Sequence, residues 1–181
     1  LAQPESIYRP ATDFLSYTGP LIFGTVLAAV LALIIAVPFA FGIALFISHY
    51  APPKLAGPVA YVIDLLAAVP SVVFGLWGAQ ALSTAFQPVQ AWLADHAGWL
   101  PFFAGPVSAT GRTMLTAGVV LAIMILPIVT AISREVFAQT PRLHEEAALA
   151  LGATRWEMIR MAVFPYGRSG MVSAVMLGLG R

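Results

Sequence analysis

The chain has 181 residues, of which 60% are hydrophobic and only 9% are charged, and its formal net charge is +1. Soluble domains contain roughly 45–50% apolar and about 25% charged residues, so this composition excludes an ordinary soluble domain and predicts an integral membrane protein. The absence of cysteine excludes disulfide frameworks, thiolate metal sites and cysteine nucleophiles.

The N-terminal part combines an irregular opening with a long apolar run. Residues 1–19 lack the basic and apolar regions of a signal peptide, and the first residue is not Met, so we expect the chain to begin inside a longer protein. The first candidate membrane span is 21–48, which is longer than the about 20 residues a spanning helix needs, so it is expected to tilt. Pro38 interrupts this span, as membrane helices tolerate.

The second candidate span is 59–80, and a loop rich in proline separates it from the first. The following stretch, 81–112, mixes apolar, polar and proline residues, and we expect an extramembrane loop with one short amphipathic helix around 89–96. Trp92 and Trp99 in this stretch are suited to the lipid headgroup region.

The last third contains one more complete candidate span, 113–133, a polar segment, 134–168, and a short apolar end, 169–181. Thirteen residues give about 20 Å of helix, which is short of the roughly 30 Å hydrocarbon core. We therefore expect 1–181 to be a single transmembrane domain truncated at both ends, with three full spans and the start of a fourth.

The distribution of basic residues predicts the orientation in the membrane. Alternation of the spans places the loop after the first span and the segment 134–168 on one side, with six basic residues, against two on the other side. The positive-inside rule assigns the richer side to the cytoplasm. The six are Lys54, Arg134, Arg142, Arg155, Arg160 and Arg168, and the two are Arg9 and Arg112.

The polar segment is predicted to form two short helices at the inner membrane surface. Thr140 and Pro141 suit the N-cap and first position of one helix, which Gly152 would end. Thr154 and Glu157 form the pattern of a capping box that starts the next helix. On physical grounds alone, this hairpin could be an amphipathic interfacial element with no special role.

The same segment resembles the EAA loop of ABC importer permeases. The match consists of Glu146-Ala147-Ala148, three residues, Gly152, nine residues, and an apolar ending before Pro165. The family expects Ile and Leu in that ending, where this chain has Ala162 and Phe164. The resemblance implies a coupling helix that docks on the ATPase subunit. It assigns polar contact to Glu146 with its neighbour Glu145, close helix approach to Ala147 and Ala148, and an elbow to Gly152.

Three further stretches resemble phosphate permeases, in particular those of the PstC type: 65–78 (LLAAVPSVVFGLWG), 115–129 (LTAGVVLAIMILPIV) and 175–181 (VMLGLGR). The resemblance implies an all-α bundle of the type I ABC importer kind that translocates phosphate across the bacterial inner membrane. It also implies a pair of ATPase subunits, a second permease subunit, a periplasmic phosphate-binding protein and membrane lipid as partners. Nucleic acid is not expected as a partner.

Other functions remain open from sequence. An importer for sulfate or molybdate is the nearest alternative, and a membrane scaffold without transport is a more distant one. An intramembrane enzyme would need a catalytic pair, and Asp64 is the single acidic residue within the candidate spans. Neither a Walker A pattern nor a second histidine after His144-Glu145 is present, so we expect no ATP hydrolysis by this chain, no metal and no cofactor.

Three residues are candidates for the substrate pathway. An acidic residue within a span, such as Asp64, is a functional candidate because its burial is costly, but it could equally pair locally near the cytoplasmic surface. Ser71 follows Pro70, whose missing amide could expose polar backbone to a pathway or merely kink the helix. Arg181 would lie near mid-membrane in the fourth span, where it could bind phosphate through its planar guanidinium or form a structural ion pair.

Overall fold

The computed structural model describes residues 14–99 and 108–180, whose regular secondary structure is helical, with no strand. Four of the described helices contain proline inside the helix, at Pro20, Pro38, Pro58, Pro88 and Pro127. Helix α1 (Phe14–Leu45) continues into the π-helical turn η1 (Phe46–Tyr50). The chain then forms α2 (Pro53–Ala68), α3 (Ser71–Trp77), η2 (Gly78–Leu82), α4 (Ser83–Ala97), α5 (Met114–Ala138), α6 (Arg142–Ala150), α7 (Arg155–Met158), η3 (Ile159–Val163) and α8 (Phe164–Leu179).

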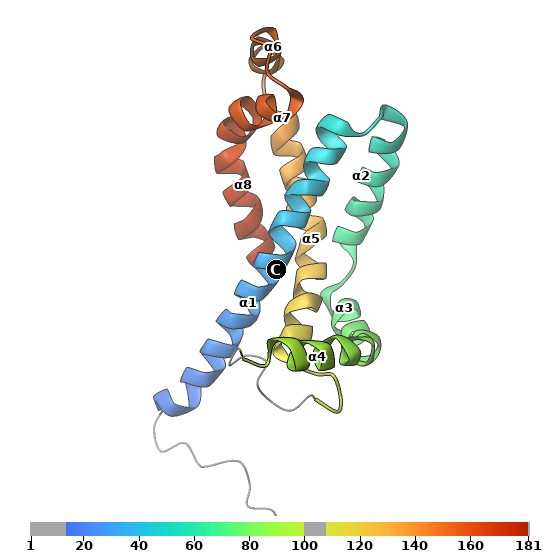
Figure 1. Cartoon of the computed structure of the whole chain (residues 1–181), viewed down its shortest axis with the longest axis vertical. Helices are drawn as coiled ribbons and strands as arrows, with labels where there is room; N and C mark the ends of the chain where they lie inside the picture. Colours follow the sequence, from blue (N-terminus) through green and yellow to red (C-terminus); the bar gives the residue numbers. More distant parts are fainter. Residues whose placement is uncertain (1–13, 100–107, 181) are drawn as a thin grey trace, which may run out of the picture.

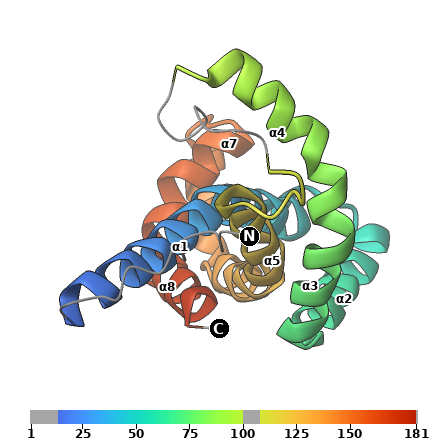
Figure 2. The same cartoon turned by 90° about the horizontal axis from the view of Figure 1, so that it is seen from below.

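Helix α5 is the centre of the bundle, with α1, α2 and α8 packed around it (Figures 1 and 2). Its N-terminus is fixed by the N-cap Thr113, whose hydroxyl accepts a hydrogen bond from the amide of Thr116 at 3.3 Å. Its 25 residues correspond to about 37 Å of helix, enough to cross a hydrocarbon core of roughly 30 Å.

Small residues let the helices of the bundle approach closely. On α1, four alanines at intervals of four residues face the interior and are 0–3% exposed. On α8, glycines lie against α5, and a Cβ added at Gly178 would come within 2.6 Å of Val129 Cγ2. Such small-residue contacts are typical of helix packing in membranes, where van der Waals contact replaces the hydrophobic effect as the driving force. The four alanines are Ala32, Ala36, Ala40 and Ala44.

The chain between α2 and α4 turns sharply instead of continuing as one straight helix. The helical directions of 53–68 and 71–97 differ by 88° across the break at Val69 and Pro70. As a result α4 lies across the end of the bundle (Figures 1 and 2). The expected span 59–80 is therefore broken near its middle, because proline supplies no amide to the helix ladder and disfavours helical geometry at the residue before it. The expected amphipathic helix around 89–96 is part of the longer α4.

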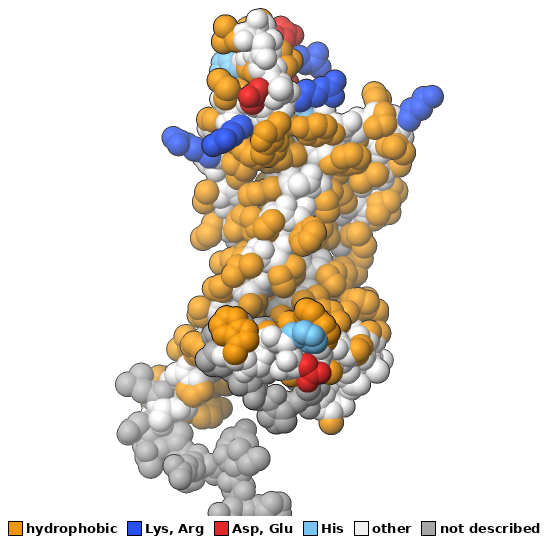
Figure 3. Space-filling view, viewed as in Figure 1, with side chains coloured by type: hydrophobic (Ala, Val, Ile, Leu, Met, Phe, Trp, Pro, Cys, Tyr) orange, Lys and Arg blue, Asp and Glu red, His pale blue; other side chains and the backbone are white. Residues whose placement is uncertain are grey.

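The surface has the character of a membrane protein. On the face shown in Figure 3, apolar side chains cover the middle of the molecule, and lysine and arginine side chains gather at the end that carries α6 and α7. Among the described residues, two helices are long and apolar enough to cross a membrane, Ser16–Tyr50 and Met114–Ala138, and the bent pair would make a third. The expected fourth span corresponds to α8, which ends at Leu179.

Candidate functional site

Helix α6, which carries the residues assigned to ATPase coupling, begins one residue later than expected. Pro141 is the N-cap, in extended geometry, and no side chain caps the helix. The expectation that Thr140 caps the helix is therefore wrong. The Thr140 side chain is buried, and its hydroxyl has no hydrogen-bond partner among the described residues. Proline favours an extended conformation at the residue before it, which directs Thr140 into the interior rather than toward the first amides of the helix.

Gly152 forms the elbow between α6 and α7, as expected, because its backbone has φ of +84°. Its amide donates to the carbonyl of Leu149 at 3.0 Å, and the amide of Ala153 donates to that of Ala148 at 3.2 Å. These two bonds are those of a Schellman motif, in which a residue with positive φ ends the helix. Gly152 thus sets the angle at which the chain leaves α6.

The predicted capping box at the start of α7 is confirmed. The Thr154 amide and hydroxyl donate to Glu157 Oε2 at 2.7 and 2.8 Å, and the Glu157 amide donates to Thr154 Oγ1 at 3.4 Å. The hydrogen bond from the Thr154 amide, with that from its hydroxyl, holds the pKa of the exposed Glu157 carboxyl below its usual value. The helix that begins here continues through η3 into α8, so the capping box fixes the start of this whole continuous helix.

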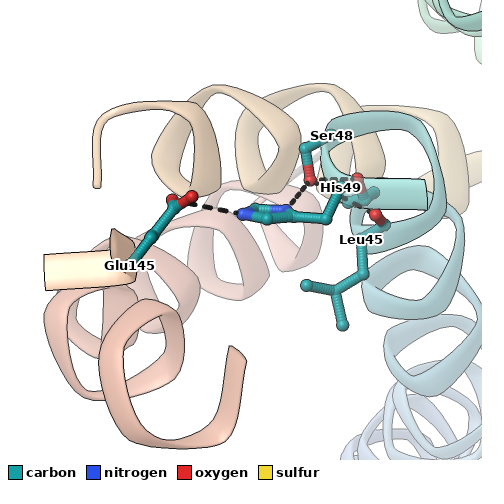
Figure 4. Close-up of polar contacts among 5 residues, drawn as sticks. Leu45, Ser48, His49 and Glu145 are labelled. Atoms are coloured by element: carbon teal, nitrogen blue, oxygen red, sulfur yellow. Dashed lines mark hydrogen bonds and ion pairs between the residues drawn. The ribbon is translucent and has the colours of Figure 1, made fainter. Parts of the chain in front are cut away.

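The inner face of α6 is attached to the bundle by one apolar and one polar contact. Ala148 is 8% exposed and packs in a cluster with residues of η3, α1 and α5. Glu145, three residues earlier and thus on the same face, accepts from His49 Nε2 at 3.4 Å (Figure 4). The other members of the cluster are Ala44, Leu45, Phe137, Met158, Ile159 and Val163.

The outer face of α6 is free and carries two strongly exposed leucines among polar side chains. Leu143 and Leu151 are 75% and 86% exposed. Glu146 and Ala147 are exposed as well, and Glu146 makes no hydrogen bond or ion pair with another described residue. Ala147 and Ala148 both line a groove of about 510 Å³ between α6, η3 and the start of α8. Of these two alanines, which were expected to allow close helix approach, Ala148 also packs in the core cluster.

Asp64 makes a local ion pair. Its carboxylate lies 3.3 and 3.5 Å from Arg134 Nη2, joining α2 to α5, and both side chains are partly exposed. Pairs with this degree of exposure contribute little to stability, about 0–1 kcal/mol. The local pairing that the sequence left open therefore occurs, and it leaves the carboxylate accessible.

Ser71 begins α3 directly after the break at Pro70, and its side chain is exposed. Asp64 lies almost two helical turns before this break, so the structure does not bring Asp64 and Ser71 together in one contact. The third pathway candidate, Arg181, lies outside the described residues.

The opposite end of the bundle contains a polar network that sequence reasoning missed. The buried Gln90 of α4 donates through Nε2 to the carbonyl of Gly111 and to the hydroxyls of Thr113 and Thr116, at 2.8–3.0 Å. Gly111 has φ of +67°, and a Cβ there would clash with the Ser83 carbonyl. The network fastens α4 to the N-terminus of α5, and a cavity of about 350 Å³ lies beside it between η2 and α5.

His49 was the other residue missed. Its isolated position in the sequence gives no signal, because its partner Glu145 is 96 residues away. Gln90 had a weak signal, namely a polar side chain on an otherwise apolar flank of the predicted amphipathic helix. Among the described residues, His, Asp and Glu form no group of three that could hold a metal ion.

Comparison with known proteins supports the resemblance found in the sequence. The chain is 58% identical over 159 residues to the phosphate transport system permease protein PstC 2 of Mycobacterium tuberculosis, covering 87% of this chain and 49% of that protein. It is 45% identical to PstC of Haemophilus influenzae, covering 98% of this chain and 61% of the relative. For PstC of Mesorhizobium japonicum the identity is 39%, with 96% and 54% covered.

These relatives confirm the resemblance to PstC-type permeases, and the chain spans about half the length of the curated relatives it matches. The helical architecture, the apolar spans and the relatives together also confirm an all-α, multi-pass protein of the inner membrane. Residues 36–181 match the family of binding-protein-dependent transport system inner membrane components. The chain therefore belongs to this family of transport permeases.

Proposed function

We propose that the chain is part of the permease subunit of an ATP-driven importer that moves inorganic phosphate across the bacterial inner membrane. The observation that carries this proposal is the projecting element α6–Gly152–α7, in a chain whose relatives are named as phosphate transport permeases. The permease supplies the pathway and performs no covalent chemistry. The partners are two ATPase subunits, a second permease subunit and a periplasmic phosphate-binding protein, with membrane lipid around the spans.

The exposed face of α6 is suited to docking on the ATPase. Helix α6 projects beyond the end of the bundle (Figure 1) and exposes Leu143 and Leu151, an unusual surface for a cytoplasmic loop in water. Burial in a protein cleft would remove this apolar surface from water, at about 25 cal/mol per Å². Glu146 is exposed one helical turn after Leu143 and would make the polar contact.

Asp64, Ser71 and Arg181 are proposed to line the pathway. The break at Pro70 interrupts the helix within an apolar segment, and broken helices in transporters commonly expose backbone groups to the substrate. Arg181 would supply the planar donors that match phosphate oxygens. In the full transporter, Arg181→Gln should abolish phosphate uptake while the complex still assembles, and wild-type uptake would remove Arg181 from the pathway.

The proposal is tested with the full-length permease and its partner subunits in proteoliposomes. ATP-dependent uptake of radiolabelled phosphate should occur and should resist competition by sulfate and molybdate. Uptake of sulfate or molybdate in place of phosphate would assign another oxyanion. Stable binding of the ATPase without ATP-dependent uptake of any of these oxyanions would overturn the transport function.

A further inference from the structure

A chain of polar contacts links the cytoplasmic end of the first long helix to the inner face of α6 (Figure 4). Ser48 Oγ lies 2.8 Å from the Ala44 carbonyl and 2.7 Å from His49 Nδ1. His49 Nε2 lies 3.4 Å from Glu145 Oε1. The side chains of His49 and Glu145 are 9% and 24% exposed, so water screens their interaction only partly.

The geometry makes His49 Nε2 a donor in either protonation state. In a neutral ring, the Ser48 hydroxyl donates to Nδ1, and the proton of the ring resides on Nε2, facing the carboxylate. In a protonated ring both nitrogens donate, and the Ser48 hydroxyl turns to the Ala44 carbonyl. The tautomer with a bare Nε2 would direct its lone pair at Glu145 and is disfavoured.

This contact is the polar half of the attachment of α6. The apolar half is Ala148, which packs in its cluster by van der Waals contact and has no directional side-chain bond. The bond from His49 to Glu145 is directional and joins elements that are remote in sequence, η1 and α6. A displacement of α6 would therefore act on η1 through Glu145 and His49 in addition to the apolar packing.

We propose that His49 is a positioning residue that ties the coupling helix to the first span through Glu145, so that movement of α6 by the ATPase is transmitted to α1. The inference rests on the proposed function, because it assumes that α6 is where the ATPase acts. The proposed role of the imidazole is exerted through Glu145 and requires no contact with the substrate or the ATPase. Its role is to hold α6 and η1 in a fixed relative position.

The first test uses the full transporter with its ATPase in proteoliposomes, and it measures the ATP hydrolysed per phosphate imported. His49→Ala should raise this ratio by about tenfold, a value within the range for coupling between sites, while ATPase binding is retained. Glu145→Ala should raise the ratio by a similar factor. The double variant should be no worse than either single variant. His49→Gln, whose side-chain amide can donate to Glu145, should restore most of the coupling. His96→Ala, at the exposed histidine of α4, is the matched control.

The second test does not depend on the ATPase. Spin labels at Leu55 and Leu151, both exposed, report the distance between the start of α2 and the end of α6 in the detergent-solubilised permease. The distribution of distances between the two spin labels should broaden in His49→Ala and stay narrow in His49→Gln. Unchanged distances together with an unchanged ATP ratio, or additive losses in the double variant, would overturn the positioning role. If the distances broaden in His49→Ala but the wild-type transporter imports no phosphate, the proposed function is rejected and the positioning role of His49 stands.

Discussion

The elbow at Gly152 allows the coupling geometry to be perturbed through the backbone alone. Its φ of +84° is in the left-handed region, and a Cβ added there would meet no atom within 4 Å. A substitution therefore introduces backbone strain without a steric clash with neighbours. The strain is about 1–2 kcal/mol for an ordinary L residue, smaller for asparagine and larger for a β-branched side chain.

We expect Gly152→Asn, Gly152→Ala and Gly152→Val to be increasingly damaging. The strain in Gly152→Val is comparable to what the two hydrogen bonds of the Schellman motif contribute, about 1 kcal/mol each, so we expect the elbow to open and α7 to be displaced relative to α6. The assay is phosphate uptake together with co-purification of the ATPase with the full-length permease. Both should fall by about tenfold in Gly152→Val, since about 1.4 kcal/mol corresponds to a factor of ten.

Two comparisons make this prediction decisive. Asparagine and valine are similar in size, so a difference between them reports the backbone and not the volume of the side chain. Gly42→Ala in α1 is the control, because that glycine is also exposed, lies in regular helix and has no atom within 4 Å of the position that an added methyl group would take. Normal uptake and ATPase binding in Gly152→Val, or equal losses for asparagine and valine, would refute the reasoning.

Three further outcomes are expected. Gly178→Ala should lower the free energy of unfolding of the purified protein by about 1–3 kcal/mol, because the added methyl group would contact Val129. Combining it with Val129→Ala should reverse part of this loss, and an additive loss would contradict this packing. Because the pKa of the Glu157 carboxyl is lowered in the folded protein, the carboxylate stabilises the start of α7 fully above its unfolded-state pKa, and this stabilisation is lost as pH falls through the folded-state pKa. Hydrogen exchange of the α7 amides should therefore become less protected in acid, and Glu157→Gln should remove this pH dependence. Single cysteines at Asp95 and Leu151 should react with an impermeant thiol reagent from the periplasm and the cytoplasm, respectively, and the reverse would overturn the orientation.

Features set by neighbouring residues were predictable from sequence. The capping box of Thr154 and Glu157 and the elbow at Gly152 each depend on contacts within a few residues, and both occur in the structure. Thr140 shows the limit of this approach, because a good capping residue was directed into the interior by the proline that follows it. Local sequence patterns identify the conformations that a residue such as Thr140 can adopt, and the surrounding packing determines which one occurs.

Features that depend on contacts between distant segments could not be predicted. The bend at Pro70 is 88°, and its size depends on how α3 and η2 lie against α5, where Gly78 meets Val120. A proline in the sequence indicates a weak point in the helix but not the angle that results. The pairing of His49 with Glu145 likewise required the position of α6, which a single sequence does not define.

The packing of the bundle suggests how a movement of α6 would reach the proposed pathway. Helices α1, α5 and α8 are joined through alanine and glycine contacts that leave little room for sliding, and α6 is attached at one end of this group. The chain that carries Ser71 is separated from α2 by the break at Pro70, which has no continuous helical hydrogen bonding to resist bending. We therefore expect α1, α5 and α8 to move with α6 as one unit, and the position of Ser71 relative to that unit to change. We expect the deformation to concentrate at the break at Pro70, where the helix is already interrupted. A small displacement of α6 would therefore alter access for an anion at this break.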